Sequence, residues 1–213
     1  MAAAAAAAAA KLPGDLAVPE DPQGLVLFAH GSGSTRRSPR NRTVAGRLWD
    51  ERLATLLFDL LTPGESVDRS LVFDIRLLAD RLAAATRWVQ SSADVASLPL
   101  GYFGASTGAG AAVWAAAEPS SRVATVVSRG GRPDLAGPRL ADVRAPTLLL
   151  VGSLDVDVLE LNREAQMQLR CPTELVVVPG ASHLFEEPGT LEQVADHAAR
   201  WFLRHLVPVR DAP

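Results

Sequence analysis

One serine in the sequence lies in a pattern that is typical of an activated nucleophile. An apolar run enters Gly104-Ala105-Ser106-Thr107-Gly108, and an alanine-rich segment follows. Small residues on both sides of a serine permit a tight turn from a strand into a helix, which would lift Ser106 Oγ above a sheet at a helix N-terminus. The same pattern also occurs where a strand-to-helix turn serves packing alone.

The glycines of this segment offer a second interpretation, because Gly104, Gly108 and Gly110 also fit a dinucleotide-binding loop. Such loops normally follow the first strand of the fold, and they need an acidic residue at the end of the next strand. Here earlier strands are predicted, and the next one is followed by Ser128 and Arg129. The pattern therefore favours a nucleophile.

A nucleophilic serine needs a histidine base and a carboxylate that orients it, in the chain order serine, acid, histidine. Asp155 and His183 each follow a predicted strand in that order. Asp155 would accept from His183 Nδ1–H, while His183 Nε2 takes the proton of Ser106. Alone, Asp155 could cap a helix, Asp157 competes with it, and His183 could be a surface residue. Together they predict a catalytic triad.

The negative oxygen of an acyl-transfer intermediate needs backbone N–H donors. Thr107 would supply one. The second is expected in the glycine-rich segment 30–34, where Ser32 is favoured over Gly31 as the donor. His30 is expected to hold this segment in place.

Charge and rare residues exclude several function classes. The 213 residues include 21 basic and 24 acidic side chains, with a net charge of -3, which does not suit a nucleic-acid or anionic-membrane binder. Lys11 is the single lysine, so phosphate-loop, Schiff-base and protein-kinase chemistry lack their residue. Cys171 is the single cysteine, and His197 and His205 lack ligand spacing to His30. We expect no metal and no cofactor.

Short apolar runs alternate with longer amphipathic segments along the chain. The apolar runs read as buried strands, and the amphipathic segments carry apolar residues at helical spacing. The predicted strands are Leu25–Ala29, Ala54–Asp59, Leu98–Phe103, Val123–Val127, Thr147–Val151 and Glu174–Val178, and the predicted helices are Val72–Gln90, Thr107–Ala117, Val158–Leu169 and Leu191–Leu206. The alternation predicts an α/β fold with a mostly parallel sheet, helices on both faces, and a site at the carboxyl ends of the strands.

We expect one domain over residues 11–213, because no linker or repeat divides them and this length can bury a sizeable core. The alanine run Ala2–Ala10 is uninformative. No apolar stretch reaches the roughly 20 residues that span a bilayer. The N-terminus is a poor export signal, because Lys11 follows the apolar run and does not precede it. A soluble, cytoplasmic protein is expected.

With these motifs in view, the chain resembles the α/β-hydrolases, and among them the dienelactone hydrolase group. The resemblance covers roughly residues 11–206 and rests on Leu27–Ser34, Leu57–Thr62, Gly101–Gly108, Ser128–Asp134 and Gly180–Glu186. It implies a minimal α/β-hydrolase fold without lid insertions, and hydrolytic chemistry. Dienelactone hydrolases use a cysteine nucleophile, so this chain resembles a serine variant of the group. The family pattern begins with two N-terminal strands, the first of which would fall on or near the alanine run.

Arginines follow two of the predicted strands and are candidates for substrate recognition. Arg36, Arg37, Arg40 and Arg42 come after the glycine-rich segment, and Arg129 follows a later strand. At the carboxyl edge of the sheet, Arg36, Arg40 or Arg129 would bind an anionic group of the substrate, although each also suits a surface ion pair.

The tryptophans lie on the apolar stripes of predicted helices and are expected in the core, not in the pocket. They are Trp49, Trp88, Trp114 and Trp201.

The sequence thus predicts a serine hydrolase that cleaves a small carboxylic ester or lactone through an acyl-enzyme. The same triad would also serve an acyltransferase or thioesterase, and the fold could bind a ligand without catalysis. The expected partner is a small ester, which an anionic group would suit, and the expected protein is a monomer or homodimer that binds neither nucleic acid nor membrane.

Overall fold

The computed structural model describes residues 11–207, so the alanine run and the strand expected on or near it lie outside the described residues. Seven strands form a sheet in the order β1-β3-β2-β4-β5-β6-β7. They are β1 (Gly14–Ala17), β2 (Gly24–Ala29), β3 (Leu53–Phe58), β4 (Leu100–Ala105), β5 (Val123–Arg129), β6 (Thr147–Gly152) and β7 (Thr173–Val178). β1 is antiparallel to β3, and the other neighbours are parallel.

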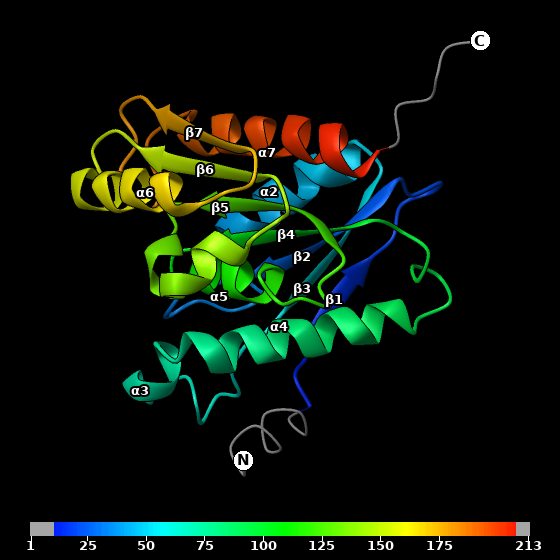
Figure 1. The fold of residues 1–213 in the computed structure, drawn as a ribbon. Helices are drawn as coiled ribbons and strands as arrows, with labels where there is room; N and C mark the ends of the chain where they lie inside the picture. The colour runs from blue at the N-terminus through cyan, green and yellow to red at the C-terminus, as the bar shows by residue number, and fades with distance from the viewer. Residues whose placement is uncertain (1–10, 208–213) are drawn as a thin grey trace.

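Helices cover both faces of this sheet (Figure 1). One face carries α2 (Pro39–Asp50) and α7 (Thr190–Leu206), and the other carries α4 (Ile75–Gln90), α5 (Thr107–Ala116), α6 (Val156–Gln168), the 3-10 segment η1 (Pro133–Asp142) and the short α3 (Arg69–Val72). A separate apolar cluster fills the space on each side of the sheet. The predicted α/β class with a mostly parallel sheet is therefore confirmed.

The central strands are buried on both faces because their sequences are almost entirely apolar. All residues of β2, β3, β4 and β6 are buried, as expected for a parallel sheet between two helical layers. β7 lies at the edge of the sheet and is only partly buried. The parallel strands all end at the same side, which brings the predicted site residues to one edge of the sheet.

Three elements lie outside every predicted range: β1, α2 and η1. β1 is only four residues long, and Asp15 interrupts its apolar character. α2 begins inside the arginine-rich segment, where Ser38 caps the helix by accepting from the Asn41 N–H and Pro39 occupies the first turn.

The predicted helix 72–90 was wrong at its start. α3 ends at Val72, and a new helix begins at Ile75, because the Asp74 side chain accepts from the Leu77 N–H and caps α4.

None of the helices within residues 11–207 is both long and apolar enough to traverse a lipid bilayer.

The expectation that all four tryptophans belong to the core was also wrong. Trp201 is buried, and its Nε1 donates to Thr125 Oγ1. Trp49 and Trp88 are 43% and 52% exposed, because they lie on the outer sides of α2 and α4. Helical spacing places apolar residues on one side of a helix. When that apolar side is wider than the face that packs on the sheet, the residues at its edges stay exposed to water.

Candidate active site

Ser106 lies in a strained turn between β4 and α5. Its backbone has φ 50° and ψ -124°, a conformation that side-chain-bearing residues rarely adopt. The turn needs a glycine at 108, because a Cβ there would collide with the backbone carbonyls of Ala29 and His30. Ser106 precedes the first residue of α5, yet its hydroxyl makes no capping bond to the helix. The Ser106 hydroxyl is therefore held at the start of α5 without taking part in the capping of the helix.

The acid and the base predicted from the sequence are in contact. Asp155 Oδ2 lies 2.6 Å from His183 Nδ1. Asp155 precedes α6 but makes no side-chain capping bond to it, so its carboxylate serves the histidine and not the helix. Asp157, the competing candidate, is exposed in the first turn of α6. The structure therefore pairs His183 with Asp155.

The imidazole of His183 lies over the strand end beside the nucleophile. A Cβ placed on Gly130 would lie 3.6 Å from His183 Nδ1, and Gly130 has φ 48°. The preceding residue, Arg129, accepts from the Ser106 N–H at 3.3 Å. His183 contacts only Asp155 through its ring nitrogens among the described residues. The bond from Ser106 Oγ to the ring is not formed here, and such bonds often tighten only when substrate binds.

The predicted oxyanion donors surround the serine. The position of a Cβ on Gly31 is 2.8 Å from Ser106 Cβ, so this loop packs directly against the nucleophile. Within residues 11–207, the N–H groups of Gly31, Ser32 and Thr107 donate to no backbone acceptor. Gly31, Ser32 and Thr107 also line the same cavity. Free N–H groups at a helix N-terminus and a neighbouring loop are suited to stabilise an oxyanion.

Two side-chain contacts fix residues 30–36, which we call the oxyanion loop, to the segment that follows β3. His30 Nε2 accepts from the Leu60 N–H at 2.9 Å, and its Nδ1 lies 3.0 Å from the Gly31 oxygen. Burial lowers the pKa of His30, so the ring is neutral and Nδ1 is the protonated nitrogen. Arg36 donates from its backbone N and from Nη1 to Asp59, both at 2.6 Å. His30 therefore holds the loop, as expected from the sequence.

A cavity of about 250 Å³ opens beside the oxyanion loop, on the side of the sheet that carries α3 and α4. Its lining is largely apolar away from the loop, and Asp59 stands at its polar end. The walls beyond the loop are Asp59, Leu60, Leu61, Pro63, Ser66, Val72 and Leu78. Sequence reasoning missed Asp59, although a charged residue directly after a buried strand was a usable signal.

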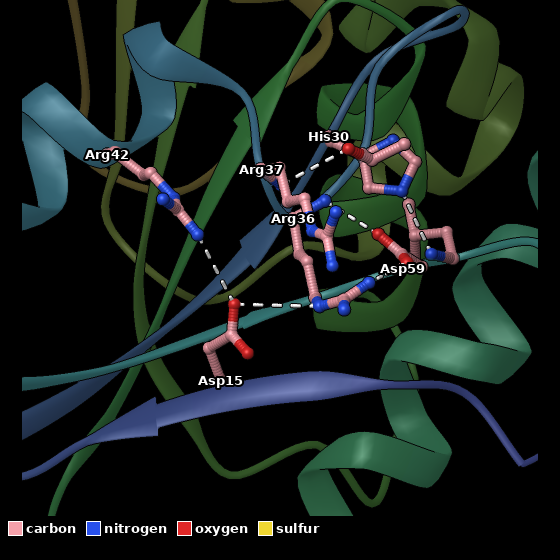
Figure 2. Close-up of polar contacts among 8 residues, drawn as sticks. Asp15, His30, Arg36, Arg37, Arg42 and Asp59 are labelled. Carbon is pink, nitrogen blue, oxygen red and sulfur yellow. Dashed lines mark hydrogen bonds and ion pairs between the residues drawn. The ribbon is translucent and has the colours of Figure 1, made fainter.

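The three candidate arginines have different surroundings. Figure 2 shows Arg36 between Asp59 and Asp15, where it ties the oxyanion loop to β3 and β1. Arg40 pairs with Glu186 at 3.2 Å. Arg129 is buried, and its Nε has no hydrogen-bond partner. A role of any of them in substrate binding stays a prediction.

Within residues 11–207, no group of three or more histidine, cysteine, aspartate or glutamate side chains is placed to hold a metal ion. The expected absence of a cofactor stays a prediction.

Comparison with known proteins finds relatives in both sequence and fold. The crystal structure of a dienelactone hydrolase from Anabaena variabilis is 54% identical, with a TM-score of 0.90, over 93% of this chain and 94% of that one. Est1E from Butyrivibrio proteoclasticus, solved with ferulic acid, has a TM-score of 0.78 at 17% identity over 91% of this chain and 95% of that one, a likeness of fold alone. No protein-family model matches the sequence.

Two Mycobacterium tuberculosis proteins with similar sequences carry the provisional name phosphoribosyl transferase. Each is 63% identical over 193 residues, which make up 91% of this chain. The matched part is only 44% of the length of these relatives, so this chain spans less than half of each.

Proposed function

Because this chain belongs to the dienelactone hydrolase family of α/β-hydrolases, we propose that it hydrolyses a small carboxylic ester or lactone through an acyl-enzyme on Ser106. The observation that carries the proposal is the 2.6 Å contact between Asp155 and His183 beside a serine held in a strained turn. A packing turn or a pure binding module has no need of all three groups in this arrangement.

In the proposed reaction, Ser106 Oγ attacks the carbonyl carbon while His183 Nε2 takes its proton. The free N–H groups of Ser32 and Thr107 stabilise the resulting oxyanion, with Gly31 as the alternative loop donor. Collapse of the intermediate breaks the ester C–O bond, and the leaving oxygen receives the proton from His183. Water then repeats the sequence on the acyl-enzyme and releases the acid. Asp155 keeps the imidazole in the required tautomer and stabilises its charged form.

Transfer of the acyl group to another acceptor, or cleavage of a thioester, would use the same groups. We favour water as the acceptor, because the esterases and hydrolases among the structural neighbours share this fold. We attribute the phosphoribosyl transferase name of the mycobacterial relatives to the part that this chain does not cover, since a serine, histidine and aspartate triad suits acyl chemistry. A cytoplasmic location and a small-molecule partner complete the proposal.

The test is hydrolysis of p-nitrophenyl acetate and butyrate by the full chain and by its Ser106→Ala variant. We expect turnover by the parent protein and its loss, by about 10³-fold or more, in the variant, because the nucleophile is gone while a methyl group fits the turn. A fluorophosphonate label should map to Ser106 by mass spectrometry. Undiminished turnover by Ser106→Ala, or labelling elsewhere, would contradict the assignment of the nucleophile.

A further inference from the structure

Arg129, the last residue of β5, is a buried cation without a counterion. Its side chain is 7% exposed, and its Nε has no hydrogen-bond partner. Its terminal nitrogens make no hydrogen bond or ion pair among the described residues. Nε is the one guanidinium nitrogen that is both fully buried and unpartnered, so the terminal nitrogens reach the surface. Removing an unpaired charge from water is costly, and proteins normally pair such a group. An unpaired buried arginine therefore indicates a ligand that supplies the negative charge.

A second arginine, Arg40, adds positive charge near Arg129. Arg40 lies near enough to disfavour the charged form of Arg129, and burial together with Arg40 lowers the pKa of Arg129 to about 10. The side chain is thus still charged at neutral pH. The ion-pair partner of Arg40 is Glu186, whose side chain is 63% exposed. The carboxylate of Glu186 therefore pairs with Arg40 alone, and Arg129 is left without a counterion.

Arg129 lies on the side of the nucleophile where the base is found. Its carbonyl accepts from the Ser106 N–H, and its guanidinium carbon lies 5.8 Å from the ring centre of Phe185. Phe185 comes two residues after His183 and packs with the layer of α2 and α7. The apolar cavity opens on the opposite face, toward α3 and α4.

This division matters because the two halves of an ester go in different directions. The leaving oxygen must receive its proton from His183 Nε2, so the alcohol half lies toward the loop that carries His183. The acyl half then points away from that loop, toward the cavity. The cationic side near Arg129 therefore faces the alcohol half of the substrate, and the apolar cavity faces the acyl half.

We propose that Arg129, with Arg40 beside it, determines specificity by binding an anionic group on the alcohol half of the substrate, while the cavity receives an apolar acyl half. This inference rests on the proposed function. The planar fork of a guanidinium binds carboxylate and phosphate oxygens in pairs, and low exposure strengthens the attraction. The substrate class is an ester of a small apolar acid with a carboxylated or phosphorylated hydroxyl compound.

The experiment compares acetate esters that differ only in the leaving group. The probes are 4-acetoxybenzoate, its neutral methyl ester and 4-acetoxyphenyl phosphate, together with monophenyl succinate, which carries its charge on the acyl half. We expect kcat/KM for 4-acetoxybenzoate to exceed that for the methyl ester by about tenfold to a hundredfold. The phosphate probe distinguishes a phosphate site from a carboxylate site. A kcat/KM for 4-acetoxyphenyl phosphate above that for 4-acetoxybenzoate indicates a phosphate site, and a lower one indicates a carboxylate site.

The key variant is Arg129→Met, which removes the charge and keeps most of the volume. We expect it to erase the preference for the charged ester through KM. The circular dichroism spectrum and the thermal unfolding midpoint of the variant, compared with those of the parent protein, show whether it folds. Arg132→Met is the matched control, because Arg132 follows in the same segment but already pairs with Asp134 at 2.8 Å. It should keep the preference.

Three kinetic results would overturn the inference: equal kcat/KM for the charged and neutral esters in the parent protein, an unchanged preference in Arg129→Met, or a preference for monophenyl succinate. Calorimetric binding of phenyl phosphate and benzoate to Ser106→Ala, with and without Arg129→Met, gives a readout that needs no turnover. Anion binding that Arg129→Met abolishes would support the site even if no ester were hydrolysed. Anion binding that depends on Arg129, together with no hydrolysis of any ester, would refute only the proposed function. Absence of anion binding would refute the inference.

Discussion

At the scale of single residues, Asp155 forgoes a favourable contact. An aspartate directly before a helix usually accepts from the first N–H groups, and this cap contributes about 1 kcal/mol. Asp155 instead gives its carboxylate to His183 and leaves α6 without a side-chain cap. Its position therefore has a cost in helix stability that is offset only if the histidine needs a partner.

Replacing this carboxylate should damage the reaction more than the fold. We expect Asp155→Asn to lower kcat for p-nitrophenyl acetate by about 10⁴-fold, because the amide would favour the wrong tautomer of His183. Asp157→Asn is the matched control, since Asp157 is exposed two residues away, and it should keep full activity. The reverse outcome would show that the acid is Asp157.

The burial of His30 leads us to predict that the stability of the fold depends on pH. Burial lowers the pKa of this histidine, so the unfolded chain binds a proton that the folded one rejects. Stability is fully present above the unfolded value of about 6.5 and declines as the pH falls below it, by no more than about 1.4 kcal/mol per pH unit from this group.

The matching variant is His30→Gln, whose amide oxygen can accept from the Leu60 N–H without titrating. In urea unfolding between pH 5 and 8, it should lose less stability on acidification than the parent protein. His197 and His205, whose pKa values burial also lowers, remain in both proteins and cancel in the comparison. Identical slopes would mean that His30 is not the buried neutral group described above.

At the scale of elements, a helix holds the segment that both anchors the oxyanion loop and lines the cavity. Arg81 of α4 is 2% exposed, and it donates to the Leu60 carbonyl at 3.0 Å and to both carboxylate oxygens of Glu65 at 2.7 and 2.8 Å. Arg81 holds the pKa of Glu65 down at about 2. Arg81 thus joins the contacts of His30 and Arg36 in holding the segment 59–66 in position.

Arg81→Leu should lower the free energy of unfolding by about 3 kcal/mol, because the carboxylate of Glu65 would lose its partner and the Leu60 carbonyl its donor. The pairing stabilises the fold above the unfolded pKa of about 4.3 and is lost as the pH falls toward 2, so the variant should also show a shallower acid limb. The control is Arg76→Leu, an exposed arginine of the same helix, with an expected change within about 0.5 kcal/mol. Denaturant unfolding at pH 7 and pH 3 measures both effects.

The same elements show what the sequence can and cannot reveal. The six strands from β2 to β7 were predictable, because continuous runs of valine, leucine and phenylalanine suit a strand covered on both faces. The meeting of Asp155 and His183 at one edge of the sheet was predictable, since both follow parallel strands that end at the same side. β1 was not, because four residues that include Asp15 carry no periodic signal. The lack of a partner for Arg129 depends on distances between loops that no local pattern encodes.

At the scale of the whole molecule, the described chain has no lid over the site, and one small cavity receives the acyl half. A volume of about 250 Å³ corresponds to about eight water-sized groups at roughly 30 Å³ each. We expect kcat/KM for p-nitrophenyl esters to rise from acetate to butyrate and to fall steeply beyond about six acyl carbons, since longer chains find no apolar wall to bury against. A constant rate from butyrate to decanoate would contradict this.

The order of the strands has a consequence for the way activity is acquired during folding. The turn that carries Ser106 joins β4 to α5 and packs against the ends of β2 and β5, whereas its base and acid follow β7 and β6, the last strands to enter the sheet along the chain. Even the pair of Asp155 and His183 is separated by 28 residues. A partly folded chain can therefore possess a complete serine turn and yet be inert. In a refolding experiment, the return of ester hydrolysis should report the docking of the C-terminal strands, and it should lag behind signals that report helix formation alone.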